Sequence, residues 1–187
     1  MIKPFLAKSI ADLSTLLSQA ETYAPQLQRL ADTMLECFGR RGKALICGNG
    51  GSAADAMHFA EELSVRFCKN RRALPAIALL DASVLTCAAN DFGYNAIFSR
   101  QVEALGHPND ILIAMTTSGN SPSVIAAVES ARANGLVTCA FLGKDGGKLR
   151  GVCDIELFVP HNDAARVQEI HKLLFHTICA WLDSKVD

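Results

Sequence analysis

The first forty residues carry apolar side chains at helical spacing. Leucines within 13–17 and again within 27–35 recur at steps of three and four residues, so each set lies on one helical face. Pro25 stands between the two sets, either as a helix break or as a first-turn residue of the second helix. The segment 4–38 is therefore predicted to form two amphipathic helices.

Beyond residue 43 the pattern changes to short apolar runs that alternate with helical stretches. Most runs are apolar throughout, as in strands that are buried on both faces of a parallel sheet. The predicted strands are Ala44–Cys47, Ala76–Leu80, Ile111–Met115, Val137–Leu142 and Ile155–Val159. The predicted helices are 52–67, 82–89, 94–105, 122–134 and 163–184.

This alternation of strands and helices is typical of an α/β fold. It predicts a doubly wound sandwich with about five parallel strands, preceded by the N-terminal helices. A chain of 187 residues suits one such domain. In folds of this kind ligands bind at the carboxyl ends of the strands, near the point where the strand order reverses.

Composition limits the partners that the chain can have. Half of the residues are hydrophobic, only 20% are charged and the mean hydropathy is +0.19, a balance that favours a subunit interface. No apolar run approaches the ~20 residues that cross a bilayer, so we expect no membrane partner. The net charge of -1 argues against nucleic-acid binding.

The cysteines and the first residues favour a cytoplasmic location. The seven cysteines are odd in number and show no C-x-x-C spacing, and residues 1–8 lack the features of a signal peptide. Cysteines in apolar surroundings are interpreted as buried free thiols of a protein in a reducing compartment. This interpretation covers Cys37, Cys47, Cys87, Cys139 and Cys179.

A glycine-rich turn, Gly48–Ser52, follows the first predicted strand and opens a helix. Free backbone N–H groups at a helix N-terminus hold phosphate, and glycines let an anion approach the backbone closely. Ser52 is expected to cap this helix and to offer its hydroxyl group. Any tight strand-to-helix turn can use glycine, so this turn alone is weak evidence for phosphate binding.

A second polar turn, after the third predicted strand, strengthens that interpretation. Residues Thr116–Ser121 supply four hydroxyl groups and a glycine, and Ser121 is expected to cap a helix with Pro122 in its first turn. Donors without Lys or Arg suit the monoester phosphate of a small sugar better than a nucleotide triphosphate. Alone this segment is explained as a capped turn, but two such turns at strand ends predict a bound phosphate.

Two predicted helices carry candidate catalytic or metal-binding groups. His58 and Glu62 lie one turn apart on one face, where the ordinary interpretation is a polar surface pair. The last helix carries Gln168, His171 and His176. His176 has apolar neighbours, and a lone histidine in such surroundings is more often a core residue with its hydrogen bonds satisfied. His171 lies beside a lysine and is a candidate for an exposed position. If the two helices meet, His58, Glu62, Gln168 and His176 form a mixed nitrogen and oxygen shell of the type that zinc accepts.

Two further polar clusters have open interpretations. Asn90 and Asp91 offer contacts for sugar hydroxyls, or they belong to a turn that caps a helix beginning near Tyr94. The basic cluster in 66–72 is either a solvated turn or a contribution to an anion-binding site.

Together these motifs resemble one family over essentially the whole chain. Similar segments occur in the sedoheptulose 7-phosphate isomerases, also called phosphoheptose isomerases, of the sugar isomerase (SIS) domain superfamily. The segments are Cys47–Glu62, Asn90–Phe92, Thr116–Ser121, Gly143–Lys148 and Gln168–His171. The resemblance implies a single SIS domain over 1–187 with flavodoxin-like topology. It also implies a homotetramer with active sites at subunit interfaces, in which the helical segment 1–40 serves oligomerisation.

The resemblance implies conversion of sedoheptulose 7-phosphate to D-glycero-D-manno-heptose 7-phosphate, on the pathway to the heptose of lipopolysaccharide core. Carried onto this chain, the acid/base pair falls on Glu62 and His176, with one zinc per subunit. The implied zinc ligands are His58, Glu62, Gln168 and His176. The implied substrate contacts are Gly50, Gly51, Ser52, Glu62, Asn90, Asp91, Thr116, Thr117, Ser118, Ser121 and Gln168. Because a strong metal bond lowers the basicity of a carboxylate, the two roles of Glu62 compete.

The chain departs from the family pattern at Ala165, Thr116 and Ser64, and two other functions are open. Ala165 stands where some members carry an aspartate, and Asp163 is a candidate substitute. The first alternative function is a non-catalytic scaffold similar to the replication-initiator-associating proteins, which tend to lack the carboxylate and the terminal-helix histidine. The second is an isomerase of another sugar phosphate. The presence of Glu62 and His176 favours a catalyst over the scaffold.

Overall fold

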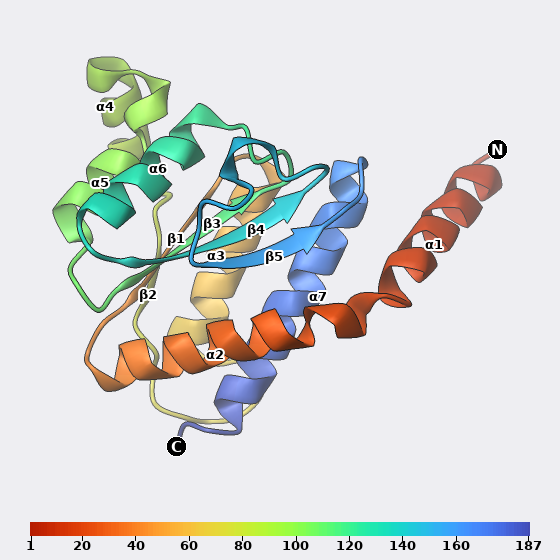
Figure 1. Ribbon diagram of the computed structural model, residues 1–187, viewed down its shortest axis with the longest axis horizontal. Coiled ribbons are helices and arrows are strands. Elements are labelled where there is room, and N and C mark those ends of the chain that lie inside the picture. Colours follow the sequence, from red (N-terminus) through yellow and green to blue (C-terminus); the bar gives the residue numbers. More distant parts are fainter.

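The computed structural model describes all 187 residues as a layered α/β unit with two N-terminal helices (Figure 1). Five strands form the sheet: β1 (Ala44–Gly48), β2 (Ala76–Ala78), β3 (Ile111–Thr116), β4 (Val137–Gly143) and β5 (Ile155–Val159). The α-helices are α1 (Lys3–Leu17), α2 (Ala24–Gly39), α3 (Gly51–Ser64), α4 (Ala82–Phe92), α5 (Ser99–Leu105), α6 (Pro122–Ala133) and α7 (Ala164–Asp183). The predicted strands and most predicted helices are confirmed within a few residues.

All neighbouring strands pair in parallel, in the order β2-β1-β3-β4-β5. The strand order therefore reverses between β1 and β3, whose last residues lie side by side, since Gly48 pairs with Met115. This is the doubly wound, flavodoxin-like sheet that the sequence predicts. The switch point of such a sheet is where ligands bind, and both polar turns of the sequence leave from it.

Helices cover both faces of the sheet, and alternate residues of each central strand point to opposite layers. In β1, Ala44 and Ile46 belong to the core formed with α2, α3 and α7, whereas Leu45 and Cys47 belong to the core formed with α4, α5 and α6. All five residues of β1 and all six of β3 are buried. These strands are apolar throughout because neither face meets water.

Helix α1 projects away from this body, with the N-terminus at its far end (Figure 1). Only Leu16 of the helix is buried. The large apolar side chains of Ile2, Phe5, Leu6 and Ile10 are exposed. Clustered apolar surface of this kind is typical of protein interfaces. No helix in the structure has the length and apolar character needed to span a bilayer.

Three expectations about residues 82–105 are wrong. The helix expected over 94–105 is a 3-10 turn, Tyr94–Ala96, followed by the separate helix α5. The helix expected to end at residue 89 continues to Phe92, so Asn90 and Asp91 lie in its last turn rather than in a loop. Cys87 is exposed, because it lies on the solvent face of that helix, while Cys37, Cys47, Cys139 and Cys179 are buried free thiols as expected.

His171 is fully buried rather than exposed, since successive residues on a helix point in different directions. Its Nε2 lies 3.1 Å from the carbonyl oxygen of Leu142 at the end of β4, and its Nδ1 has no partner. Burial lowers the pKa of His171 to about 4, against the hydrogen bond to Leu142, which raises it. The residue is thus a neutral tether between α7 and the sheet.

This burial predicts that acid destabilises the protein through His171. In the unfolded chain this histidine gains a proton near pH 6.5, but in the folded protein it does so only near pH 4. The stability that the neutral His171 contributes is therefore complete above pH 6.5 and is lost as the pH falls from 6.5 toward 4. The loss amounts to about 3 kcal/mol at pH 4. Urea unfolding at pH 7 and pH 4.5 should show a smaller pH dependence for His171→Gln than for wild type. The exposed control His107→Gln should behave as wild type, and equal pH dependence in all three proteins would contradict the assignment.

Candidate active site

The turn between β1 and α3 has the geometry of an anion-binding site. Gly50 is the residue before the helix and has a φ of +56°, a conformation that favours glycine. Gly50 and Gly51 are both exposed, so a ligand can approach the start of α3, where the first N–H groups of a helix have no partner within the helix. Ser52 does not cap the helix as expected, because Gly50 occupies the cap position and Ser52 is buried inside the first turn.

The second turn, between β3 and α6, folds around the hydroxyl group of Thr116. The Thr116 Oγ1 accepts hydrogen bonds from the N–H groups of Ser118, at 3.4 Å, and Gly119, at 3.2 Å. Gly119 has a φ of +63°, and a Cβ there would lie 1.8 Å from the carbonyl oxygen of Gly146. Thr116 therefore shapes the turn from a buried position, while Thr117, Ser118 and Ser121 are half-buried. Ser121 precedes α6 as predicted, but its side chain makes no capping bond.

Asn49 joins the glycine turn to its surroundings, a role that the motif analysis missed. Its Nδ2 donates to Ser123 Oγ at 2.9 Å, and its Oδ1 accepts from the hydroxyl of Tyr94 at 2.8 Å. The position of Asn49 between two glycines was the available signal, whereas nothing local points to Tyr94. Asn90 and Asp91 lie nearby on α4, exposed and bonded to each other at 2.7 Å. No contact joins them to the two turns.

Three predicted catalytic or metal-binding side chains converge from α3 and α7. The Nε2 of His58 lies 3.1 Å from Glu62 Oε1 and 3.5 Å from the Nε2 of His176. The Nε2 of His176 is 4.0 Å from the same Glu62 oxygen. We call His58, Glu62 and His176 the trio. All three are half-buried, so a small ligand can reach them.

The donor set of the trio fits zinc. One ligand atom from each residue lies within 4.8 Å of the other two, and two histidines with one carboxylate are a catalytic zinc set that leaves a position open. Burial, and next the neighbouring His58, lower the pKa of His176, which favours the neutral imidazole that a metal requires. The trio is also suited to proton transfer without any further group.

Apolar contacts below the trio hold its two helices together. Phe59 of α3 stacks on Phe175 of α7, with ring centroids 5.1 Å apart and both side chains fully buried. The His58 ring meets the same Phe175 edge-on at 5.4 Å. Such aromatic pairs contribute about 0.5–1.5 kcal/mol beyond their buried area. The two helices therefore meet through specific contacts that no sequence rule could establish.

Gln168 lies at the other end of the same helix pair. A Cβ on Gly51 would lie 2.5 Å from Gln168 Nε2, so the glutamine amide rests against the first turn of α3. Between Gln168 and the trio, Lys172 pairs with Asp55, with Nζ and Oδ1 3.3 Å apart. The structure thus brings Gln168 to the glycine turn and brings the other three predicted zinc ligands together. Asp163 caps α7 by accepting a hydrogen bond from the N–H of Ala165 at 2.9 Å.

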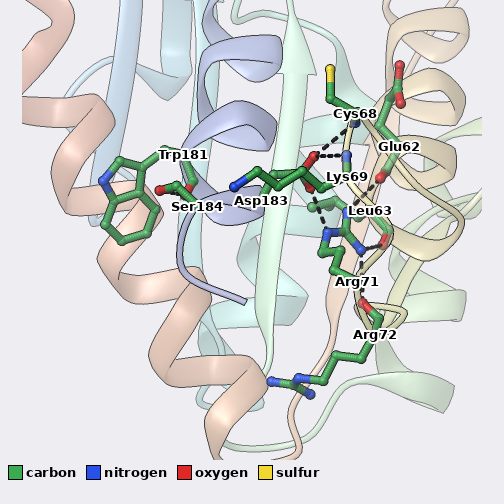
Figure 2. Close-up of polar contacts among 9 residues, drawn as sticks. All are labelled: Glu62, Leu63, Cys68, Lys69, Arg71, Arg72, Trp181, Asp183 and Ser184. Atoms are coloured by element: carbon green, nitrogen blue, oxygen red, sulfur yellow. Dashed lines mark hydrogen bonds and ion pairs between the residues drawn. The ribbon is translucent and has the colours of Figure 1, made fainter. Parts of the chain in front are cut away.

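A buried ion pair fixes the far ends of α3 and α7 (Figure 2). Arg71 Nε donates to Asp183 Oδ1 at 2.8 Å, and these side chains are only 0% and 3% exposed. The remaining donors of Arg71 reach the carbonyl oxygens of Leu63, at 2.9 Å, and Glu62, at 2.8 Å, in the last turn of α3. Arg71 is therefore neither a solvated residue nor an anion-binding one. It caps the helix that carries Glu62.

Asp183, the last residue of α7, completes this clamp. Its Oδ2 accepts hydrogen bonds from the N–H groups of Cys68, at 2.8 Å, and Lys69, at 2.9 Å (Figure 2). Burial disfavours the carboxylate, but these bonds and Arg71 outweigh burial and hold the pKa of Asp183 below its usual value. The loop after α3 is in this way tied to the end of α7.

Comparison with known proteins identifies the family. Residues 9–143 match the SIS domain family. A phosphoheptose isomerase of Fusobacterium nucleatum is 52% identical over 160 residues, which cover 86% of this chain and 82% of the relative. A second, from Aliarcobacter butzleri, is 47% identical over 187 residues, or 100% of this chain and 97% of the relative. This chain belongs to the phosphoheptose isomerase family.

Solved structures agree with this assignment. A phosphoheptose isomerase from Neisseria gonorrhoeae matches with a TM-score of 0.93 and 41% identity, over 98% of this chain and 100% of that one. One from Francisella tularensis matches with a TM-score of 0.90 and 37% identity, over 98% and 96% of the respective chains. Phosphoheptose isomerases therefore share the whole architecture of this chain, including its N-terminal helices.

The Arg71–Asp183 clamp predicts a large loss of stability when one partner is removed. Arg71→Leu leaves a buried carboxylate without its charge partner, which typically costs about 3–5 kcal/mol. Arg40→Leu is the matched control, since Arg40 pairs with Glu36 on the surface, where such pairs are worth at most about 1 kcal/mol. Urea denaturation of both variants measures the difference. Equal stability of the two would show that the clamp does not hold the helices.

Proposed function

We propose that the protein is an isomerase that converts sedoheptulose 7-phosphate to D-glycero-D-manno-heptose 7-phosphate. The convergence of the trio is the observation that carries this proposal, because α3 then has a helix N-terminus suited to phosphate at one end and Glu62, facing His176 of α7, toward the other. The similarity to proteins named phosphoheptose isomerase, over 86% and 100% of this chain, supports it. The reaction belongs to the pathway that supplies heptose for lipopolysaccharide core.

The trio suits a proton transfer between two adjacent carbons. Glu62 removes a proton from C1 of the ketose, an enediol forms, and the same carboxyl returns a proton to C2. His176 moves the second proton between the two oxygens. Its lowered pKa favours the neutral imidazole, which can accept this proton and return it. The 4.0 Å between Glu62 Oε1 and His176 Nε2 lets the carboxylate reach C1 and C2 while the imidazole reaches their oxygens.

Zinc is part of this proposal, held by His58, Glu62 and His176, with Gln168 as the fourth ligand implied by the family resemblance. When bound, zinc polarises a carbonyl group. Glu62 cannot be both a strong ligand and a strong base at once. To bind zinc, the Gln168 side chain has to turn from the Gly51 backbone toward the trio. If it stays against Gly51, its role is to bind substrate.

The phosphate of the substrate is assigned to the two turns at the switch point. In this proposal the phosphate binds the N–H groups of Gly51 and Ser52 at the start of α3 and the hydroxyls of Thr117, Ser118 and Ser121 in the turn before α6. The other expected substrate contacts are Gly50, Thr116, Asn90, Asp91 and Gln168. In this arrangement the phosphate is bound by the first turn of α3, and the carbonyl end of the sugar faces the trio three turns further along.

The assembly in this proposal is a cytoplasmic homotetramer. The exposed apolar side chains of α1, among them Phe5 and Ile10, support an oligomerisation role for segment 1–40. The alternative function as a non-catalytic scaffold needs the same surface but gives no reason for the trio to converge. An isomerase of a different sugar phosphate would share the trio and both turns, so the choice of substrate rests on the named relatives.

The proposal predicts that Glu62→Gln abolishes turnover of sedoheptulose 7-phosphate. Loss of a general base lowers kcat by about 100-fold or more, whereas phosphosugar binding and folding should persist. The matched control is Glu61→Gln, which alters an exposed carboxylate at the neighbouring position of the same helix. Product formation is followed by NMR, with and without a chelator, which shows whether a metal is required.

Two outcomes would contradict this account. Wild-type turnover retained by Glu62→Gln would exclude Glu62 as the base. A wild-type protein that binds the phosphosugar without converting it would favour the scaffold or another sugar phosphate.

A further inference from the structure

The facing surfaces of α3 and α7 carry an ion pair at their centre that the proposed mechanism does not use. On α7, four residues turn the helix by about 40° beyond one full turn, so Lys172 lies between Gln168 and His176 on one face. On α3, Asp55 lies between Gly51 and His58 in the same way. The Lys172–Asp55 pair, 3.3 Å from Nζ to Oδ1, therefore lies between the glycine turn and the trio.

Asp55 is the buried member of this ion pair. The residue is only 4% exposed, and its Oδ2 has no hydrogen-bond partner. Because the carboxylate is closed to solvent, it depends on the Lys172 ammonium as its charge partner. Burial raises the pKa of Asp55, against Lys172, which lowers it.

The chemistry of the pair suits hydroxyl groups. Lys172 carries three N–H donors and is 46% exposed in its side chain, so donors are left over after the contact with Asp55. The ammonium and the carboxylate together carry no net charge, which favours a neutral polyol over a second anion. Sedoheptulose 7-phosphate bound with its phosphate at the glycine turn and its carbonyl at the trio has its hydroxyl-bearing carbons, C3 to C6, between them.

We propose that Lys172, held in place by Asp55, binds the middle hydroxyl groups of the sugar chain as a hydrogen-bond donor. This inference rests on the proposed function, since it places a phosphosugar between the two ends of the site. The pair thereby selects substrates by the length and configuration of the carbon chain that joins the phosphate to the carbonyl. Lys172 is a specificity-determining residue, Asp55 is a positioning residue, and neither takes part in proton transfer.

The test compares Lys172→Met with the double variant Asp55→Asn/Lys172→Met, which avoids an unpaired buried charge. Each should raise KM for sedoheptulose 7-phosphate about tenfold, the effect of losing a hydrogen bond to a charged group. Inhibition by inorganic phosphate should be unchanged, because phosphate alone occupies the glycine turn. The matched control Lys185→Met removes the same charge beyond the end of α7 and should leave KM unchanged.

Each other result has a defined meaning. An unchanged KM in both variants overturns the proposal. Phosphate inhibition weakened as much as KM rises would assign Lys172 to the phosphate site and also overturn it. If the wild type does not turn over sedoheptulose 7-phosphate, the proposed function fails, and calorimetry decides the role of Lys172 separately. Weaker binding of this phosphosugar by Lys172→Met than by wild type then supports the polyol site, and equal binding or none contradicts it.

Discussion

Helices α3 and α7 lie side by side in the same direction on one face of the sheet, and the whole site depends on this packing. α3 begins at the switch point between β1 and β3, so its free N–H groups meet whatever binds there. α7 returns from the last strand, β5, and adds a second row of side chains. Neither helix alone can place an imidazole, a carboxylate and a second imidazole within 4.8 Å of one another.

Contacts at three levels keep these helices in register. At the level of the glycine turn, Gly51 leaves room for Gln168, and any larger residue would collide with it. In the middle, Phe59 and Phe175 stack in the core. At the far end, Arg71 and Asp183 join the last turns of both helices. The polar groups of the site therefore rest on a rigid frame, which lets them be half-exposed without losing their mutual geometry.

The sheet and its polar turns were predictable from the sequence because their signals are local. A run such as Ile111–Met115 followed by hydroxyl-rich residues shows both the strand and its carboxyl end. The meeting of α3 with α7 was not predictable in this way, since more than a hundred residues separate Glu62 from His176, and only the family resemblance pointed to it. Arg71 was expected in a solvated turn or an anion-binding site for the same reason, because its partner Asp183 is 112 residues away in the sequence.

Local periodicity also misjudged single side chains. His171 is adjacent to Lys172 in sequence, yet the two point to different sides of α7, one into the core and one toward Asp55. Cys87 looked buried because its neighbours are apolar, although its helix turns it to solvent. Asp55 gave no signal at all, since an aspartate on a helix is ordinarily solvated and only its burial here makes it unusual.

The central claim is that α3 holds both ends of the substrate, with the phosphate at its first turn and the reacting carbons at Glu62. A crystal structure of the Glu62→Gln variant with sedoheptulose 7-phosphate tests it most directly. The account predicts phosphate on the N–H groups of Gly51 and Ser52, and C1 and C2 between residue 62 and His176 of the α7 packed against that helix. Phosphate bound elsewhere, or a sugar whose C1 and C2 point away from the trio, would contradict it.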